Sequence, residues 1–159
     1  MTTLRIKTSR FFDGERLHSD ESITVTVRGN RIAEVSGQTA PQGEAADTSE
    51  IDASSLTILP GLIDAHFHPV SASFDVASID RSRVQSAAEV IRSATRVNAE
   101  LVNMSGQIGT IAPGAFADII GVAGDPFQDL RVLAEPETHL KLVIRGGEIV
   151  LNRLTESQS

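Results

Sequence analysis

One helical period, with strand patterns on both sides of it, limits the fold of this chain more than any other feature. Within residues 82–104, mostly apolar side chains recur at steps of three and four, which places them on one face of a helix. The stripe consists of Val84, Ala87, Ile91, Ala94, Asn98 and Leu101, widened by Ala88, Val97 and Val102. We expect one helix here, with Ser82 and Gln85 as a capping box at its start and Gly106 as its C-terminal stop.

Strand patterns fill much of the remaining chain. These short apolar and β-branched runs occupy residues 4–9, 22–28, 31–35, 56–59, 117–122, 140–145 and 148–151. Gly29-Asn30 and Gly146-Gly147 each join two of the runs and predict β-hairpins. Residues 37–50 are polar and contain Pro41 and Gly43, so we expect a surface loop there. The order of strands, one helix and strands predicts an α+β fold whose sheet combines both ends of the chain.

The composition narrows the range of partners and sites. The 159 residues suffice for one compact domain, and their net charge of -7 gives an acidic surface that repels nucleic-acid phosphates. Cysteine is absent, so a metal site would have to use histidine, carboxylate or carbonyl ligands. The first 14 residues lack the apolar core of a signal peptide, and no apolar run is long enough to cross a bilayer. We therefore expect a cytoplasmic protein that binds neither nucleic acid nor membranes.

Residues 60–69, with the sequence PGLIDAHFHP, carry two histidines separated by one residue. This string resembles the first-strand motif of the amidohydrolase superfamily, whose metal-dependent hydrolases include dihydroorotase, imidazolonepropionase and prolidase-like dipeptidases. Further segments resemble the same superfamily in the same order, above all its imidazolonepropionase and prolidase-like branch. These segments are residues 12–14, 27–35, 51–54, 94–101, 106–120, 124–126 and 142–150. The resemblance implies a (β/α)₈ barrel flanked by a small β-sandwich that is built from both chain ends.

The spacing of these segments departs from the family pattern. Only 13 residues, 70–82, separate the histidine motif from the predicted helix, whereas a (β/α)₈ barrel takes roughly 250 residues. The resemblance therefore implies a truncated barrel. We expect a composite β-sandwich domain of residues 1–60 and 105–159. Residues 61–104 are expected to be a residual barrel segment that holds the histidine strand and one long helix.

His66 and His68 are candidate ligands for zinc or another divalent metal. Residues two apart on a strand project to the same face, so both imidazoles can approach one ion. A catalytic zinc ion typically has three protein ligands and a water molecule, whose pKa the ion lowers toward neutrality. The candidates for a third ligand are Asp64, Asp75 and Asp80.

The family resemblance implies further metal-site residues, which are a carboxylated lysine or a glutamate, two later histidines and an aspartate that acts as general base. The lysines and the remaining histidines of this sequence, Lys7, Lys141, His18 and His139, fall outside any barrel segment. Three interpretations of the histidine pair stay open: a self-contained site, a partial site completed by another chain, and a pair retained without a metal.

Two other aspartates stand next to turns. Asp118 and Asp125 lie beside connections that contain glycine or proline, where an aspartate accepts main-chain hydrogen bonds. We expect them to be strand-end and turn residues rather than catalysts.

The resemblance implies a metal-dependent hydrolase of amide or other C–N bonds that is incomplete as a catalyst on its own. The alternative is a non-catalytic β-sandwich that serves as a scaffold or binding module. A third interpretation is a splice product, a fragment from an incorrect gene model or an engineered minimal chain without activity.

The apolar side chains of residues 62–67 and of the helix stripe would lack the barrel strands and helices that cover them in a complete relative. Leaving a large apolar side chain exposed costs about 1.5–3 kcal/mol. We therefore expect self-association, or a partner chain that covers this surface.

Overall fold

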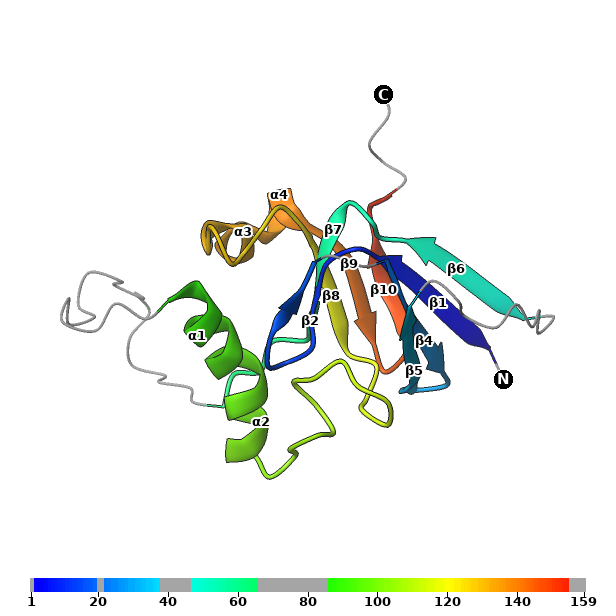
Figure 1. The fold of residues 1–159 in the computed structure, drawn as a ribbon, viewed down its shortest axis with the longest axis horizontal. Coiled ribbons are helices and arrows are strands. Elements are labelled where there is room, and N and C mark those ends of the chain that lie inside the picture. Colours follow the sequence, from blue (N-terminus) through cyan, green and yellow to red (C-terminus); the bar gives the residue numbers. More distant parts are fainter. Residues whose placement is uncertain (1, 20–21, 38–46, 66–85, 155–159) are drawn as a thin grey trace.

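The computed structural model describes residues 2–19, 22–37, 47–65 and 86–154, which form two β-sheets and a few helices (Figure 1). The strands before the helices are β1 (Thr3–Thr8), β2 (Phe11–Phe12), β3 (Leu17–His18), β4 (Ile23–Arg28), β5 (Arg31–Gly37), β6 (Thr48–Asp52) and β7 (Leu56–Pro60). The helical segment comprises α1 (Ala87–Arg92), the π-helical stretch η2 (Ser93–Val97) and α2 (Asn98–Leu101). It is followed by β8 (Ile119–Ala123), α3 (Arg131–Ala134), α4 (Pro136–His139), β9 (Leu140–Arg145) and β10 (Glu148–Asn152). The predicted mixed α+β fold is confirmed.

Both ends of the chain contribute to the larger sheet. Among the described residues, the smaller sheet has the strand order β5-β4-β1-β6, and the larger has the order β10-β9-β8-β7-β2-β3. Strand β7 pairs antiparallel with β8, from Leu56 opposite Ala123 to Pro60 opposite Ile119. This pairing joins the strands that precede the helical segment to those that follow it, as the sequence predicts.

Two tight turns close the predicted hairpins. Strands β4 and β5 pair as far as Arg28 opposite Arg31, around a turn in which Gly29 has a φ of 58°. Strands β9 and β10 are joined by Gly146 and Gly147, whose φ values are 54° and 81°. Glycine adopts positive φ without the steric penalty of a side chain, and such turns match the twist of paired strands. Both hairpins are confirmed.

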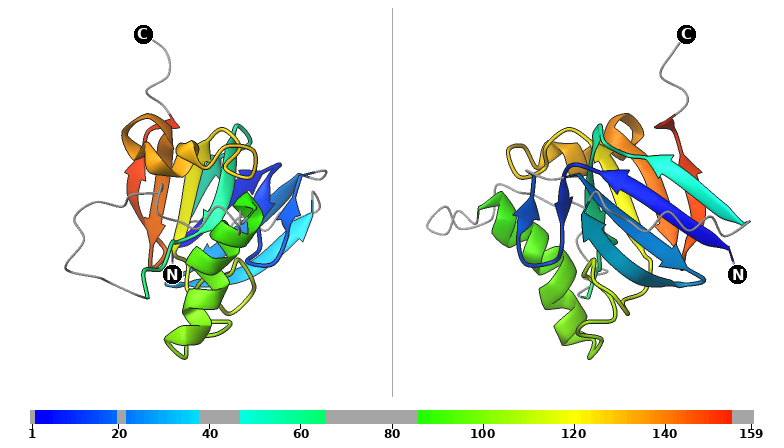
Figure 2. Two further views of the ribbon diagram at one scale, coloured as in Figure 1. Left: turned by 90° about the vertical axis from the view of Figure 1, so that its left-hand side faces the viewer. Right: turned by 45° about the vertical axis from the view of Figure 1, so that its right-hand side comes forward.

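The apolar core forms two layers, one on each face of the six-stranded sheet. The larger cluster lies between the two sheets and draws buried side chains from both. It includes Leu4, Ile6, Val25, Val27, Ile58, Ile119, Leu142 and Ile144. Because side chains alternate along a strand, neighbouring residues reach the opposite face, where the smaller cluster lies. That cluster contains Phe12, Leu59, Ile91, Val122 and Val132. Ile91 belongs to α1, so the helix packs on the outer face of the six-stranded sheet (Figures 1 and 2).

The described helix begins later than predicted. Its N-cap is Ser86, whose hydroxyl accepts a hydrogen bond from the Glu89 main-chain N–H at 3.3 Å. The Glu89 carboxylate in turn accepts the Ser86 main-chain N–H at 2.7 Å. Ser82 and Gln85, the predicted capping pair, lie outside the described residues. The observed pair repeats the same pattern four residues further on, with a glutamate that accepts hydrogen bonds better than the glutamine.

The helix also ends earlier than predicted, because an asparagine takes the place expected for glycine. After α2, Asn103 adopts a φ of 57°, and its N–H donates to the Glu100 carbonyl at 3.0 Å. The Met104 N–H donates to the Ala99 carbonyl at 2.8 Å, which completes a Schellman motif. Asparagine tolerates the left-handed region, so Gly106 is not the stop. In the described ranges, no helix is long and apolar enough to span a membrane.

The predicted loop of residues 37–50 is wrong at its C-terminal end. Residues from Thr48 onward form β6, which pairs in parallel with β1, from Thr3 opposite Thr48 to Lys7 opposite Asp52. This is an edge strand on which Ile51 alone is buried, so it lacks the apolar alternation that predicts a strand. Residues 38–46 lie outside the described residues. Other short elements, β2, β3, α3 and α4, have only two to four residues, too few for a periodic pattern.

Candidate functional site

The chain that leads into the predicted histidine motif is held by both the sheet and the helix. Residues 61–65 follow β7, and the Gly61 N–H donates to the Asp118 carbonyl at 2.9 Å, which extends the β7–β8 pairing. Two residues later, the Ile63 N–H donates to the Ala94 carbonyl at 2.8 Å. The Ile63 carbonyl accepts the side-chain amide N–H of Asn98 at 2.5 Å. Both main-chain polar groups of Ile63 are therefore bound by the helix.

The π-helical stretch explains why the Ala94 carbonyl is available. In a regular α-helix the Asn98 N–H would donate to the carbonyl four residues earlier, which is that of Ala94. Here the Asn98 N–H donates instead to the carbonyls of Ser93 and Thr95. A π-type turn thus releases one carbonyl from the helix, and Ile63 uses it.

The same widened turn receives the chain that returns to the sheet. Thr95 is buried, and its hydroxyl donates to the Ile91 carbonyl at 2.7 Å, so it is satisfied within the helix. Gly109, with a φ of 69°, packs against this turn so closely that an added Cβ would lie 2.6 Å from the Thr95 carbonyl oxygen. Segments before and after the helix therefore meet at one short stretch of it.

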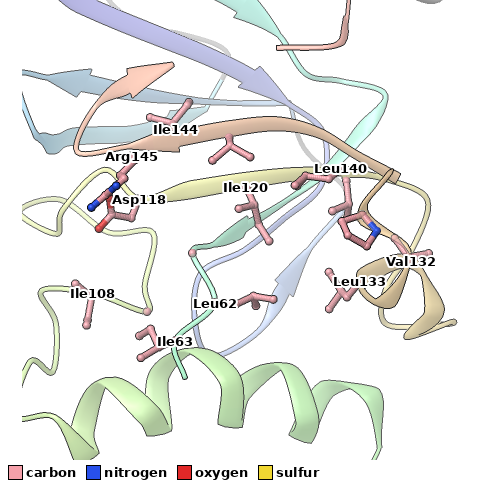
Figure 3. Close-up of a pocket in the computed structure, with 15 residues that line it drawn as sticks. Leu62, Ile63, Ile108, Asp118, Ile120, Val132, Leu133, Leu140, Ile144 and Arg145 are labelled. Carbon is pink, nitrogen blue, oxygen red and sulfur yellow. The ribbon is translucent and has the colours of Figure 1, made fainter. Parts of the chain in front are cut away.

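An apolar groove of about 490 Å³ lies beside residues 61–65 (Figure 3). Its walls come from Leu62 and Ile63, from β8 and β9, and from the short helix α3. Apolar side chains that face it include Ile120, Leu133, Leu140 and Val143. Asp118 and Arg145 stand together at one end. The groove can accept apolar surface, but its lining does not present an array of acid and base groups.

The sequence-predicted metal ligands can be placed only in part. His66, His68, Asp75 and Asp80 lie outside the described residues, and Asp64 is described and exposed. Across the described ranges, no group of three or more histidine, cysteine, aspartate or glutamate side chains could hold a metal ion. The described residues therefore do not fit a metal on their own.

The other histidines and lysines lie in the sheets and the short helices, and His18, His139 and Lys7 have partners there. His18, in β3, lies 2.7 Å from the Asp13 carboxylate through Nε2 and stacks on Phe11 with ring centroids 4.6 Å apart. His139, in α4, lies 2.8 Å from the Ala123 carbonyl through Nδ1. Lys7, in β1, pairs with Glu50 at 2.6 Å, and Lys141 lies in β9. Both lysines thus lie in strands, within the runs 4–9 and 140–145 that the sequence predicts.

Asp118 and Asp125 have the local roles that the sequence predicts. The Asp118 carboxylate accepts the Gly146 N–H at 2.7 Å and so fixes the β9–β10 turn. The Asp125 carboxylate accepts the Phe127 N–H at 2.9 Å and pairs with Arg10 at 2.8 Å. Sequence reasoning missed Asn98, because its contact joins positions 35 residues apart and no sequence pattern marks a π-type turn.

Comparison with known proteins finds similarity in sequence and in fold. The family model described as "Amidohydrolase family" matches residues 70–150, just over half of the chain. An N-substituted formamide deformylase of Arthrobacter pascens is 46% identical over 59 residues. That alignment covers 36% of this chain and 11% of the deformylase, so the chain spans about a tenth of that relative's length.

Two solved structures are similar over nearly the whole chain. A prolidase complexed with N-methylphosphonate-L-proline superposes with a TM-score of 0.72 at 14% identity, covering 95% of this chain and 100% of that chain. A Xaa-Pro dipeptidase with bound methionine in its active site gives a TM-score of 0.68 at 10% identity, with the same coverages of 95% and 100%. At these identities the similarity concerns the fold alone.

Proposed function

We propose, because the chain belongs to the amidohydrolase family, that it carries part of the active site of a metal-dependent hydrolase of amide or other C–N bonds. The family match over residues 70–150 is the observation that carries this proposal. The similarity to an enzyme named for the deformylation of N-substituted formamides supports the same bond class.

His66 and His68 are the residues proposed to hold the ion, which would be zinc or another divalent metal. Support comes from their spacing, since residues two apart on a strand share a face, and from the way the helix holds Ile63, three residues earlier. A divalent ion bound there would supply a more acidic water and polarise the scissile carbonyl. The role of this chain in the proposed site is to hold the two imidazoles in place.

The remaining ligands and the general base are proposed to come from a second copy of the chain or from a partner chain. Two imidazoles are fewer than the three protein ligands that catalytic zinc usually has. The apolar groove and the exposed side chain of Leu62 in its wall support an interface with a second chain, because contiguous apolar surface favours association.

The finer description of the fold belongs to the same proposal. Residues 1–60 and 105–159 would be the composite β-sandwich, and residues 61–104 the remainder of a truncated (β/α)₈ barrel. The fold similarity to a prolidase and to a Xaa-Pro dipeptidase supports this division.

A second candidate function is a non-catalytic scaffold or binding module. It is favoured by the buried core that the two sheets form from the described residues. In that case the sheets would be the functional unit, and the histidine pair would have no metal to bind.

The metal content of purified protein separates the two candidates. We expect the wild-type chain to retain about one divalent ion per site, measured by plasma mass spectrometry after dialysis, and His66→Ala and His68→Ala each to lose it. His18→Ala is the matched control. His18 lies in β3 and contacts the Asp13 carboxylate, so its replacement should leave the metal content unchanged. Equal, negligible metal in all four proteins would favour the binding module.

A further inference from the structure

We propose that the helical segment docks on the six-stranded sheet through an ionic latch at Glu15, which opens as the salt concentration rises. The latch consists of Glu15, in the turn between β2 and β3, and of Arg92 and Arg96 in the helical segment. It requires neither a metal nor a substrate. Its opening exposes Ile91 of the helix and the sheet residues of the same apolar cluster, Phe12 and Leu59.

The two arginines bind different atoms of Glu15. The Arg92 guanidinium donates through Nη2 to the Glu15 main-chain carbonyl at 2.9 Å. The Arg96 guanidinium forms an ion pair with the Glu15 carboxylate and, through Nε, a second ion pair with Glu100 at 3.2 Å. Residues four apart lie on the same face of a helix, so both arginines can reach one turn of the β2–β3 hairpin (Figure 1).

The β2–β3 turn is fixed by contacts that do not involve the helix. The Asp13 carboxylate accepts the N–H groups of Glu15 and Arg16 at 2.7 and 2.8 Å. The Asp13 carbonyl accepts the Thr110 hydroxyl at 2.6 Å and the Ile111 N–H at 3.1 Å, both from the chain that returns to the sheet. Glu15 is therefore held in place before the arginines bind it, which lowers the entropic cost of closing the latch.

The helix has little apolar surface packed against the sheet. In the described helical segment, Ile91, Thr95 and Ala99 are buried, and Ile91 is the one large apolar side chain among them. Isolated helices shorter than about 12–15 residues are marginal in water, so a helix that leaves the sheet also loses its hydrogen bonds. Docking therefore depends on polar contacts as well, and those at Glu15 carry charge.

Salt should weaken the latch by a modest and measurable factor. The side chains of Glu15 and Arg96 are each about half exposed. Ion pairs between exposed side chains typically change an equilibrium by about fivefold or less. The screening length falls from about 30 Å at 0.01 M salt to about 3 Å at 1 M, so this contribution decreases as salt is added.

The test compares Glu15→Gln with Glu50→Gln in the full chain. Glutamine keeps the size of Glu15 and the main-chain carbonyl that binds Arg92, but it removes the charge that binds Arg96. Glu50→Gln is the matched control, because Glu50 forms an equally exposed ion pair with Lys7 between β6 and β1, within the four-stranded sheet.

Amide hydrogen exchange, followed by NMR at neutral pH, reports opening of the helix and of the sheet separately. At about 0.01 M sodium chloride, the Thr95 and Ala99 amides should exchange about fivefold faster in Glu15→Gln than in the wild type, and within about twofold of wild type in Glu50→Gln. Raising the salt to about 1 M should bring the wild type close to Glu15→Gln. The Ile120 amide of β8 should not change.

Three results would overturn the latch. The first is equal exchange at Thr95 and Ala99 in Glu15→Gln and in the wild type. The second is wild-type exchange that does not respond to salt. The third is equal acceleration at Ile120, because Glu15 would then stabilise the whole fold rather than the docking of the helix.

Discussion

Gly109 packs directly on Thr95: a Cβ at position 109 would lie 2.6 Å from the Thr95 carbonyl oxygen. This contact presses the chain that returns to the sheet onto the π-type turn of the helix. The same turn holds Ile63 through the Ala94 carbonyl. One widened helical turn therefore contacts both the segment that contains Ile63, before the helix, and the segment that contains Gly109, after it.

Replacing Gly109 with alanine should destabilise the protein strongly. The φ of 69° disfavours any side chain, and the short contact adds a clash. We expect a loss of about 3 kcal/mol or more in the free energy of unfolding, measured by denaturant titration. Gly106→Ala is the matched control: Gly106 has a φ of 73° and no atom within 4 Å of the added Cβ, so it should lose only about 1–2 kcal/mol. Equal losses in the two variants would show that the contact has no energetic role.

The helix N-cap should weaken in acid. Hydrogen bonds from the main-chain N–H and the hydroxyl of Ser86 hold the pKa of the Glu89 carboxyl below its usual range. The unfolded chain then binds protons more readily at this group. The contribution of the Glu89 carboxylate to the free energy of unfolding is complete above the pKa of this group in the unfolded chain. It declines as the pH falls through the lower pKa of the folded state.

The variant Glu89→Gln isolates this effect, because glutamine can occupy the capping box but does not titrate. The wild type should exceed the variant in free energy of unfolding at pH 7, and the excess should shrink below about pH 4. Denaturant titrations at the two pH values measure it. A difference that stays constant with pH would contradict the assignment of Glu89 as a charged capping residue.

Self-association should depend on two exposed leucines, Leu62 in the wall of the groove and Leu101 at the end of α2. Leu101 and Leu62 are 66% and 47% exposed, and we expect the wild type to form at least a dimer at tens of micromolar. The double variant Leu62→Glu and Leu101→Glu should be monomeric by light scattering, because a buried carboxylate opposes association. Val150→Glu is the control, since Val150 is 63% exposed on the edge strand β10 and does not line the groove. A monomeric wild type would contradict the expected association.

Local sequence chemistry accounts for the parts of the fold that could be predicted. The β4–β5 hairpin depends on Gly29 and on the alternation of its neighbours, and both are visible within a few residues. The described helix starts at Ser86 and Glu89, a pair with the same capping pattern as Ser82 and Gln85, and periodicity alone does not choose between the two pairs. Strand β6 was missed because it is an edge strand with one buried side chain.

The candidate site was predictable only as a short motif. His66 and His68 are recognisable because two ligands at a spacing of two suit a strand. The hold on Ile63 was not predictable, since it requires a π-type turn and an Asn98 side chain 35 residues away. Contacts between segments far apart in the chain form only in the packed fold, and no short sequence pattern predicts them.

The coordination of zinc in the loaded protein tests the central claim most directly. X-ray absorption fine structure counts imidazole ligands, whose zinc–nitrogen distance is about 2.0 Å. We predict two imidazoles per zinc for each chain in the wild type. In His66→Ala and His68→Ala, which should lose the ion on dialysis, we predict one imidazole on the zinc that binds when excess zinc is present. A zinc ion without imidazole ligands, or with the same number in all three proteins, would contradict the assignment of this histidine pair as the metal-binding part of the chain.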